Sequence, residues 1–136
     1  MDFELSDEQR MLAESLGRWL ERNYDLAARE AAQADPPGFP AALWEGLAEL
    51  GAMAALLPEE AGGLGGGGFD IATVFEALGH ALVAAPLCEG VLMPARALIA
   101  AGRADEAAPL AEGRGRLAFV HDEPGAQYER NRIATR

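Results

Sequence analysis

The sequence of 136 residues contains no lysine, a single cysteine and few aromatic residues. All 11 basic residues are arginines, so Schiff-base chemistry and a lysine-containing phosphate loop are excluded within this chain. Cys88 has no second cysteine with which to form an internal disulfide. No apolar run approaches the roughly 20 residues that a membrane-spanning helix needs. No spacing of cysteines and histidines predicts a metal site.

The chain is strongly acidic, with 22 acidic and 11 basic residues and a formal net charge of −11 at pH 7. This charge argues against nucleic acids and anionic membrane surfaces as partners, because both would repel it. Half of the residues are hydrophobic, so a chain of this length can form the core of one domain. The acidic amino terminus lacks a signal-peptide pattern, and together with the single cysteine it leads us to expect a cytoplasmic protein.

The first third of the chain shows the helical spacing of apolar residues. Ser6 and Gln9 have the form of a capping box, and the stripe after them predicts one helix as far as about Ala32. A second helix is predicted from Pro40, with Gly51 at its C′ position. The two tryptophans fall on these helices, where core or interface packing is the simplest interpretation and cofactor stacking is the sharper alternative.

The clearest helical pattern lies in the middle of the chain. Phe69 and Asp70 predict a hydrophobic staple and an N-cap, and the stripe after them predicts a buried central helix that ends near Ala84. His80, at the edge of this stripe, is interpreted as a core or capping residue.

Another apolar face begins at Pro86. Pro94 interrupts it, and because proline removes a backbone donor we expect a kink or break near residues 91–93. Gly102 closes this element, and a short helix is predicted over residues 105–112.

The end of the chain has the texture of β structure. Residues 117–121 are predicted to form a strand, and residues 133–135 to begin a second one. Because two strands are only marginally stable in water, we interpret this part as the start of a truncated β domain. The predicted fold class is mainly α, a helical bundle over residues 1–113 followed over residues 114–136 by the first one or two β-strands of a following β domain.

A glycine-rich connection separates the second and third predicted helices. Residues 50–68 contain seven glycines, an apolar run and a Pro-Glu-Glu corner. Glycine permits positive φ angles and close approach to the backbone, so we predict a long connection with a fixed shape in the middle of the bundle. It lacks the Lys-Ser/Thr ending and the preceding strand of a phosphate-binding loop.

Four short motifs, spread over nearly the whole chain, occur in the same order as in a known protein family. Residues 57–66 read Leu-Pro-Glu-Glu-Ala-Gly-Gly-Leu-Gly-Gly, residues 75–82 read Phe-Glu-Ala-Leu-Gly-His-Ala-Leu, and residues 123–126 read Glu-Pro-Gly-Ala. Together with the opening at residues 1–10, they resemble the amino-terminal domain of acyl-CoA dehydrogenases. The motifs are specific in combination, whereas the glycine-rich connection alone would be a weak signal.

The resemblance implies a helical amino-terminal domain that precedes a β domain and a second helical domain. Members of the family remove two hydrogens from the α and β carbons of an acyl-CoA thioester and pass a hydride to FAD. Their catalytic glutamate lies late in the chain, so no catalytic residue is assigned here. We expect these 136 residues alone to be inactive and not to retain FAD. An electron-transfer flavoprotein-like acceptor and a homo- or hetero-oligomer with another acyl-CoA dehydrogenase subunit are the implied partners.

The resemblance also assigns two groups of site residues by position. The candidates for the lining of the acyl tunnel are Cys88, Glu89, Leu92 and Met93. The candidates for contact with the flavin are Phe119, Val120, His121 and Asp122. From the residues alone, Glu89 is open to two interpretations, a solvated carboxylate or a polar group on a pocket wall.

The last motif departs from the family pattern. The family has threonine before the glutamate and Gly-Ser after the alanine, where this chain has Asp122 and Gln127-Tyr128. This part looks more like the small subunit of pimeloyl-CoA dehydrogenase-type heteromers. We therefore hypothesise a subunit with altered flavin and CoA contacts, active in fatty acid or dicarboxylic acid metabolism. A non-catalytic partner subunit and a free-standing helical interaction module are the alternatives.

Overall fold

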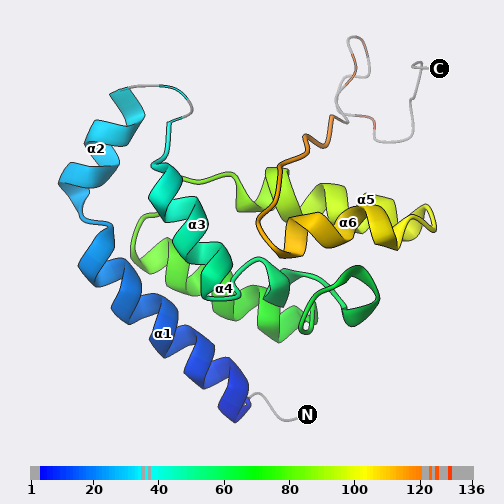
Figure 1. The fold of residues 1–136 in the computed structure, drawn as a ribbon, viewed down its shortest axis with the longest axis horizontal. Helices are drawn as coiled ribbons and strands as arrows, with labels where there is room; N and C mark the ends of the chain where they lie inside the picture. The colour runs from blue at the N-terminus through cyan, green and yellow to red at the C-terminus, as the bar shows by residue number, and fades with distance from the viewer. Residues whose placement is uncertain are drawn as a thin grey trace.

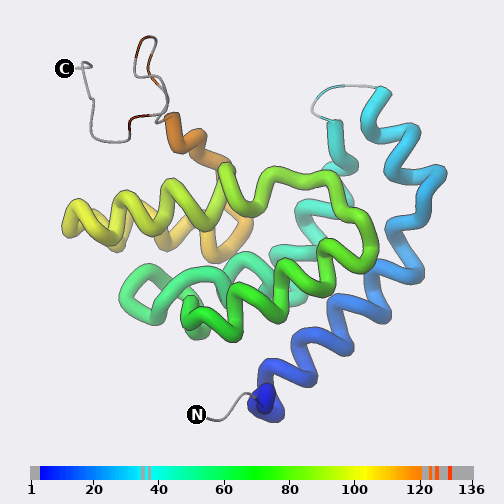
Figure 2. The backbone as a smooth tube through the Cα atoms, turned by 180° about the vertical axis from the view of Figure 1, so that it is seen from behind, coloured from blue at the N-terminus to red at the C-terminus, as the bar shows by residue number. Residues whose placement is uncertain are grey.

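The chain folds into a helical bundle in the computed structural model, which describes residues 4–34, 36, 38–120, 123, 125 and 129. Its elements are α1 (Asp7–Asn23), α2 (Leu26–Ala34), α3 (Ala41–Glu49), η1 (Ala54–Leu56), η2 (Glu59–Ala61), α4 (Gly68–His80), η3 (Cys88–Leu92), α5 (Met93–Ala100) and α6 (Ala104–Ala111). Figure 1 shows that α1 runs along α4 and that α5 lies beside α6. The helix α2 projects from the end of α1 that is farther from the amino terminus, and Figure 2 shows the same arrangement from behind. The mainly helical fold predicted from the sequence is confirmed.

One hydrophobic core joins the helices to the connection between α3 and α4. The largest fully buried side chains are Leu16, Leu20, Leu47, Met53, Leu56, Leu57, Leu87, Val74 and Val91. Full burial of each such side chain contributes roughly 1.5–3 kcal/mol, so this shared core stabilises the bundle as one unit. The core interpretation of the tryptophans is confirmed, because Trp44 is buried and Trp19 packs over Gly46.

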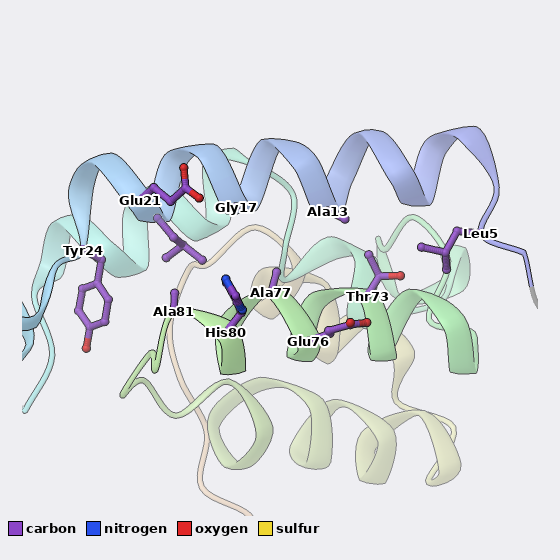
Figure 3. Close-up of a pocket in the computed structure, with 11 residues that line it drawn as sticks. Leu5, Ala13, Gly17, Glu21, Tyr24, Thr73, Glu76, Ala77, His80 and Ala81 are labelled. Atoms are coloured by element: carbon purple, nitrogen blue, oxygen red, sulfur yellow. The ribbon is translucent and has the colours of Figure 1, made fainter.

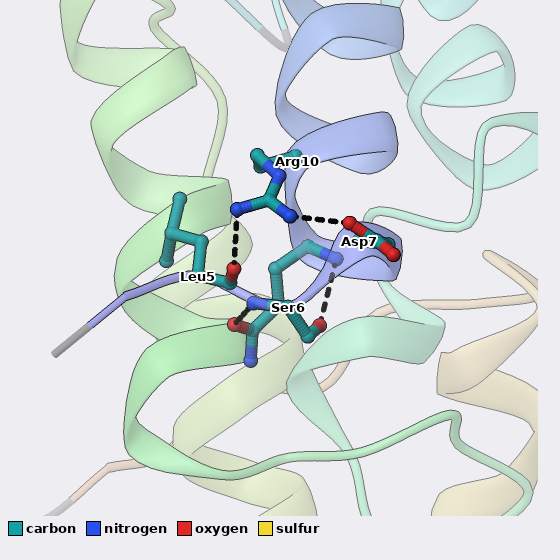
Figure 4. Close-up of polar contacts among 5 residues, drawn as sticks. Leu5, Ser6, Asp7 and Arg10 are labelled. Carbon is teal, nitrogen blue, oxygen red and sulfur yellow. Dashed lines mark hydrogen bonds and ion pairs between the residues drawn. The ribbon is translucent and has the colours of Figure 1, made fainter. Parts of the chain in front are cut away.

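The amino-terminal cap of α1 forms as the sequence predicts. The amide of Gln9 donates to Oγ of Ser6 at 3.2 Å, and the amide of Ser6 donates to Oε1 of Gln9 at 3.0 Å. Arg10 adds a hydrogen bond to the carbonyl of Leu5 at 2.9 Å and an ion pair to Asp7 (Figure 4). The two bonds between Ser6 and Gln9 satisfy amides that the first helical turn leaves without partners.

The single helix predicted as far as Ala32 is wrong, because the chain breaks at Tyr24 and Asp25 into α1 and α2. The buried Tyr24 hydroxyl accepts a hydrogen bond from the amide of Ala84 at 3.2 Å. The carboxylate of Asp25 accepts from the amide of Ala28 at 2.8 Å, which satisfies a free donor in the first turn of α2. A distant contact and a local cap thus override the continuous helical pattern.

The start of α4 corrects a second prediction. Gly67 is the N-cap, and Asp70 lies at the third position of the helix, from which its carboxylate accepts the Gly67 amide at 2.9 Å. Phe69 is therefore inside the first turn and does not form the predicted staple. The other carboxylate oxygen of Asp70 accepts from Nε2 of Gln9 at 2.8 Å, which ties the start of α4 to the start of α1.

The end of α4 comes at His80, before the predicted end near Ala84. Leu82 has a left-handed conformation with φ of 53°, and its amide donates to the carbonyl of Gly79 at 3.0 Å. The next amide donates to the carbonyl of Leu78 at 2.9 Å, and this pair of bonds forms a Schellman motif. His80 is exposed in the last turn and is not a core residue.

The break predicted near residues 91–93 takes the form of a π-helical turn, Cys88–Leu92, which we call the π turn. The amide of Met93 donates to the carbonyl of Cys88, five residues earlier, and α5 follows directly with Pro94 in its first turn. Pro94 has no amide hydrogen to give to an α-helical ladder, which explains why regular helix begins here anew. The predicted end at Gly102 is confirmed by its φ of 73°, and the short helix after it is α6.

The glycine-rich connection is folded back on the chain that precedes it. The amide of Gly65 donates to the carbonyl of Leu57 at 3.1 Å, and that of Gly66 donates to the carbonyl of Ala55 at 3.0 Å. A Cβ atom added to Gly63 would lie 1.9 Å from the carbonyl oxygen of Leu57. Glycine is required for this close approach, and the connection has the fixed shape that the sequence predicts.

The described chain directly after α6 is irregular. Residues 114–120 have no regular secondary structure, so the strand predicted over residues 117–121 is not formed in its described part. A strand needs a neighbour to pair with its backbone, and none of the described residues forms one beside it. His121 and the second predicted strand, at residues 133–135, lie outside the described residues. The division into two domains stays a prediction.

Candidate functional site

The two groups of predicted site residues lie on segments that touch each other. We call residues 114–120 the exit segment. The amide of Leu117 in the exit segment donates to the carbonyl of Gly90 in the π turn at 3.2 Å. A Cβ atom added to Gly90 would lie 3.8 Å from the carbonyl oxygen of Leu117. The structure therefore places the two segments that carry these groups next to each other.

The π turn presents a partly apolar surface. Its middle residues, Gly90 and Val91, are buried, whereas Cys88 and Leu92 are half-buried. Met93 continues this half-buried surface at the start of α5. Glu89 is exposed, which agrees with the solvated interpretation of its carboxylate. The turn thus offers a thiol and aliphatic side chains beside one exposed carboxylate.

The thiol of Cys88 is held in its neutral form. Burial raises the pKa of Cys88 above its ordinary value, and the carboxylate of Glu89 raises it further by repelling the thiolate. A neutral thiol is a poor nucleophile and packs as a small apolar group. Cys88 therefore suits the wall of an apolar site better than it suits covalent catalysis.

The exit segment exposes apolar side chains next to the π turn. Leu117, Phe119 and Val120 are 44%, 40% and 85% exposed. His121 and Asp122, the other two residues predicted to contact the flavin, lie outside the described residues. The exit segment therefore contributes exposed apolar side chains.

An aromatic clamp fixes the start of the exit segment, and sequence reasoning missed it. Nε1 of Trp44 donates to the carbonyl of Gly113 at 2.9 Å. The guanidinium carbon of Arg116 lies 5.2 Å from the ring centre of Phe39 and 5.5 Å from that of Trp44. Such cation–π contacts stabilise a chain conformation, and no local pattern links these four residues.

Sequence reasoning also missed an open groove of about 520 Å³ between α1 and α4. Figure 3 shows its lining residues on the facing sides of the two helices. The signal that could have found it is the repetition of small residues, Ala13 and Gly17 on α1, Ala77 on α4 and Ala81 at its C-cap. We call it the α1/α4 groove.

Two other kinds of site find no support in the described part of the chain. The amides of Gly65 and Gly66 donate to backbone carbonyls, so they are not directed at a phosphate group. No group of three or more possible metal ligands lies together among the described residues. Within the same residues, no helix has both the length and the apolar character to cross a membrane.

A comparison with protein families identifies the family to which this helical fold belongs. The family model described as acyl-CoA dehydrogenase, N-terminal domain, matches residues 6–107. The chain belongs to the acyl-CoA dehydrogenase family. The match runs from α1 to the first half of α6, and so it includes the π turn and the glycine-rich connection.

Curated relatives carry names from the same family. The chain is 39% identical over 110 residues to acyl-CoA dehydrogenase IpdE2 of Mycolicibacterium smegmatis, covering 80% of this chain and 35% of that protein. It is 40% identical over 119 residues to acyl-CoA dehydrogenase IpdE2 of Mycobacterium tuberculosis, covering 85% and 37%. A shorter match, 40% over 65 residues, joins it to benzylmalonyl-CoA dehydrogenase of Aromatoleum aromaticum, covering 48% and 17%.

The chain thus spans little more than a third of the length of the first two relatives. No solved structure matches it. The family generally uses FAD, and the exposed apolar side chains of the exit segment fit one side of a flat ring system.

Proposed function

We propose that this chain is the amino-terminal part of a cytoplasmic, FAD-dependent acyl-CoA dehydrogenase subunit, in which it forms one wall of the acyl pocket. The observation that carries the proposal is the bond between Leu117 and Gly90, at 3.2 Å. It holds the exit segment against the π turn. The two segments that carry the acyl-facing and the flavin-facing candidates are thereby neighbours.

The roles of the residues follow from their exposure and charge. The half-buried side chains of Cys88, Leu92 and Met93 exclude water from the acyl chain. Phe119 and Val120 border the flavin, with His121 and Asp122 as further candidates. When bound, FAD accepts the hydride from the β carbon of the substrate. The base that removes the α-proton comes from outside these 136 residues.

The proposal includes a division of labour between polypeptide segments. This chain orients the substrate and shields it, while most flavin contacts and the catalytic base lie elsewhere. A partner acyl-CoA dehydrogenase subunit completes the oligomer, and an electron-transfer flavoprotein-like acceptor removes the electrons. The limited share of the relatives' length that the chain covers, 35% and 37%, supports this division.

A chimaera tests the proposal. This chain replaces the matching segment of acyl-CoA dehydrogenase IpdE2 of Mycolicibacterium smegmatis, and flavin content is measured by visible absorbance. We expect the chimaera to retain FAD and to bleach on addition of an acyl-CoA that also bleaches the parent relative. The chain alone, purified in the same way, should be colourless and inactive. Stoichiometric FAD and acyl-CoA oxidation by the chain alone would contradict the proposal.

Substitutions in the same chimaera test the wall itself. Leu92→Trp and Met93→Trp fill space beside the acyl chain, so both should shift kcat/KM toward shorter acyl-CoA substrates by about tenfold or more. Ala100→Trp is the matched control, because Ala100 is exposed on α5 outside the π turn. An equal response of all three variants would show that the π turn does not border the substrate.

A further inference from the structure

The bond that joins the exit segment to the π turn uses a carbonyl that a regular helix would not leave free. The carbonyl of Gly90 accepts the amide of Leu117 at 3.2 Å. In an α-helix, a carbonyl accepts the amide of the residue four positions later. For Gly90 that residue is Pro94, which has no amide hydrogen. The amide of Leu117 therefore takes the place of a helical partner that the sequence withholds.

Pro94 also accounts for the shape of the turn that carries this carbonyl. In a regular helix, the ring of a proline collides with the carbonyl four residues before it. The π turn holds one residue more than an α-helical turn, because the amide of Met93 donates to the carbonyl of Cys88, five residues earlier. Pro94 follows directly and is buried at the start of α5. One proline thus explains both the missing donor and the widened turn.

Gly90 is enclosed at the point where the exit segment meets it. The residue is buried, and a Cβ atom added to it would lie 3.8 Å from the carbonyl oxygen of Leu117 and 3.8 Å from the ring of Pro86. A backbone carbonyl that is buried without a partner lowers stability. The bond from Leu117 therefore compensates for the donor that Pro94 lacks.

The exit segment reaches this carbonyl from a fixed starting point. The chain turns at Gly113, which has φ of 70° and accepts Nε1 of Trp44 at 2.9 Å. The guanidinium of Arg116 lies over the same indole, and Leu117 follows directly. The aromatic clamp thus holds the start of the exit segment on α3, whereas the carbonyl of Gly90 holds its middle on the π turn. The second anchor lies just before the residues that are proposed to border the flavin.

We propose that Pro94 is a positioning residue for the flavin side of the proposed site. By offering no amide to Gly90, it reserves that carbonyl as the docking point of the exit segment and so sets where Phe119 and Val120 lie. The inference rests on the proposed function, because it assigns a role in that site to the contact between the two segments. Pro94 acts through Gly90 and Leu117 and need not touch substrate or flavin itself.

Amide hydrogen exchange in the intact 136-residue chain, followed by NMR, tests the docking directly. In the wild type, the Leu117 amide should exchange at least about tenfold more slowly than in a free peptide, because it is hydrogen-bonded. Pro94→Ala supplies an amide that competes for the carbonyl of Gly90. The protection of Leu117 should then fall about tenfold, to that of a free amide. Unchanged protection of Leu117 in this variant would overturn the proposal.

Pro109→Ala is the matched control. Pro109 also lies inside a helix, α6, and the carbonyl four residues before it belongs to Asp105. The substitution adds a helical amide in the same way but away from Gly90, and it keeps the Pro109 carbonyl that accepts the amide of Arg114. We expect the protection of Leu117 to stay at the wild-type value. Equal losses in the two variants would show that the position of the proline is unimportant, and the proposal would be wrong.

A second variant and an internal reference separate docking from packing. Because Pro94 is buried, Pro94→Ala removes contacts as well as adding an amide. Pro94→Val adds the same amide, keeps more of the volume and should release Leu117 to the same extent. The Nε1 proton of Trp44 should keep its wild-type chemical shift, since its bond to Gly113 lies in the clamp. If the Trp44 signal changed as well, the whole segment would have loosened and Pro94 would have no specific role.

The chimaera with IpdE2 measures the consequence for flavin binding. Pro94→Ala and Leu117→Pro each remove the docking bond, so each should raise the dissociation constant of FAD at least about threefold, while Pro109→Ala should leave it unchanged. Together, the first two substitutions should add little to either alone, because they break the same bond.

The two experiments also separate this inference from the proposed function. If Pro94→Ala released Leu117 but left FAD binding unchanged, another part of the longer polypeptide would position the exit segment. The role of Pro94 would then be wrong, and the proposed function would stand. Loss of FAD from the unsubstituted chimaera would contradict the proposed function instead, and with it the flavin role of Pro94, whereas hydrogen exchange would still decide whether the docking depends on Pro94.

Discussion

The glycines of two regions differ in what surrounds them. In the glycine-rich connection, a Cβ atom on Gly63 or Gly66 would lie within 2.7 Å of backbone atoms. On α1 and α4, a Cβ atom on Gly17 or Gly79 would meet nothing within 4 Å. The same residue type therefore serves close backbone approach in one region and leaves room in the other. Substitutions separate the two uses, because only the first depends on the absence of a side chain.

The largest effect is expected inside the glycine-rich connection. Gly63→Ala forces a methyl group onto the carbonyl of Leu57, which already accepts the amide of Gly65. We expect the free energy of unfolding to fall by about 3 kcal/mol, as measured by urea denaturation followed by circular dichroism. Gly68→Ala, at the first residue of α4, is the control because its Cβ meets nothing within 4 Å. Equal losses for the two variants would show that the connection is not tightly packed.

A smaller effect is expected where helix ends are compared. Leu82 and Gly102 occupy equivalent C′ positions after α4 and α5, with φ of 53° and 73°. Leu82→Gly should raise the free energy of unfolding by about 1 kcal/mol, because a left-handed conformation is costly for residues with a Cβ. Leu82 is 61% exposed, so its side chain gives up little burial.

The reciprocal substitution sharpens this test. Gly102→Leu should lower the free energy of unfolding by about the same 1 kcal/mol, measured under identical conditions. Nothing lies within 4 Å of a Cβ at Gly102, so the loss would report backbone strain alone. A destabilised Leu82→Gly variant would mean that the exposed leucine makes contacts worth more than the strain.

At Gly17, where a side chain has room, we expect a substitution to increase the free energy of unfolding. Gly17→Ala should stabilise the chain by about 0.5–1 kcal/mol, because alanine loses less backbone entropy than glycine in a helix and has room here. Urea denaturation measures this gain, and Gly46→Ala provides the contrast, since its Cβ would lie 2.1 Å from the ring of Trp19. A loss of stability at both positions would show that Gly17 has no more room for a side chain than Gly46.

The π turn is neither as tightly packed as the glycine-rich connection nor as open as the surroundings of Gly17. The pKa of its thiol depends on this partial burial. Because the pKa of Cys88 is raised by burial and then by Glu89, its alkylation by iodoacetamide should show an inflection at higher pH than that of N-acetylcysteine. Glu89→Gln removes the second cause and should lower the inflection without restoring the value of the free thiol. An inflection that did not move would assign the whole shift to burial.

The sequence predicts those parts of the fold that depend on local chemistry. The capping box at Ser6 and Gln9, the helix end at Gly102 and the break before Pro94 each need only neighbouring residues, and all three are observed. The errors at the two ends of α4 come from local caps that were placed at the wrong residues, whereas the error at the end of α1 comes from a distant contact. Tyr24 stops α1 because its hydroxyl meets Ala84, far along the chain.

The position of the site stays a prediction, and the arrangement of its residues could not be predicted from the sequence. The family motifs assign Cys88, Glu89, Leu92 and Met93, and the structure places them on one turn and the start of the next helix. The contact of the π turn with the exit segment is a backbone bond between Gly90 and Leu117, for which side-chain patterns give no signal. The irregular backbone of the exit segment has the same origin, since a strand needs a partner that the described chain lacks.

The indole of Trp44 has a practical consequence for spectroscopy. It is hydrogen-bonded to Gly113 at 2.9 Å and covered by the guanidinium of Arg116. Any event that pulls the chain after α6 away would break that bond and change the emission of this fluorophore. Trp19 packs on Gly46 instead and supplies a constant background. The protein therefore carries an intrinsic optical sensor at the point where its helices give way to the rest of the polypeptide.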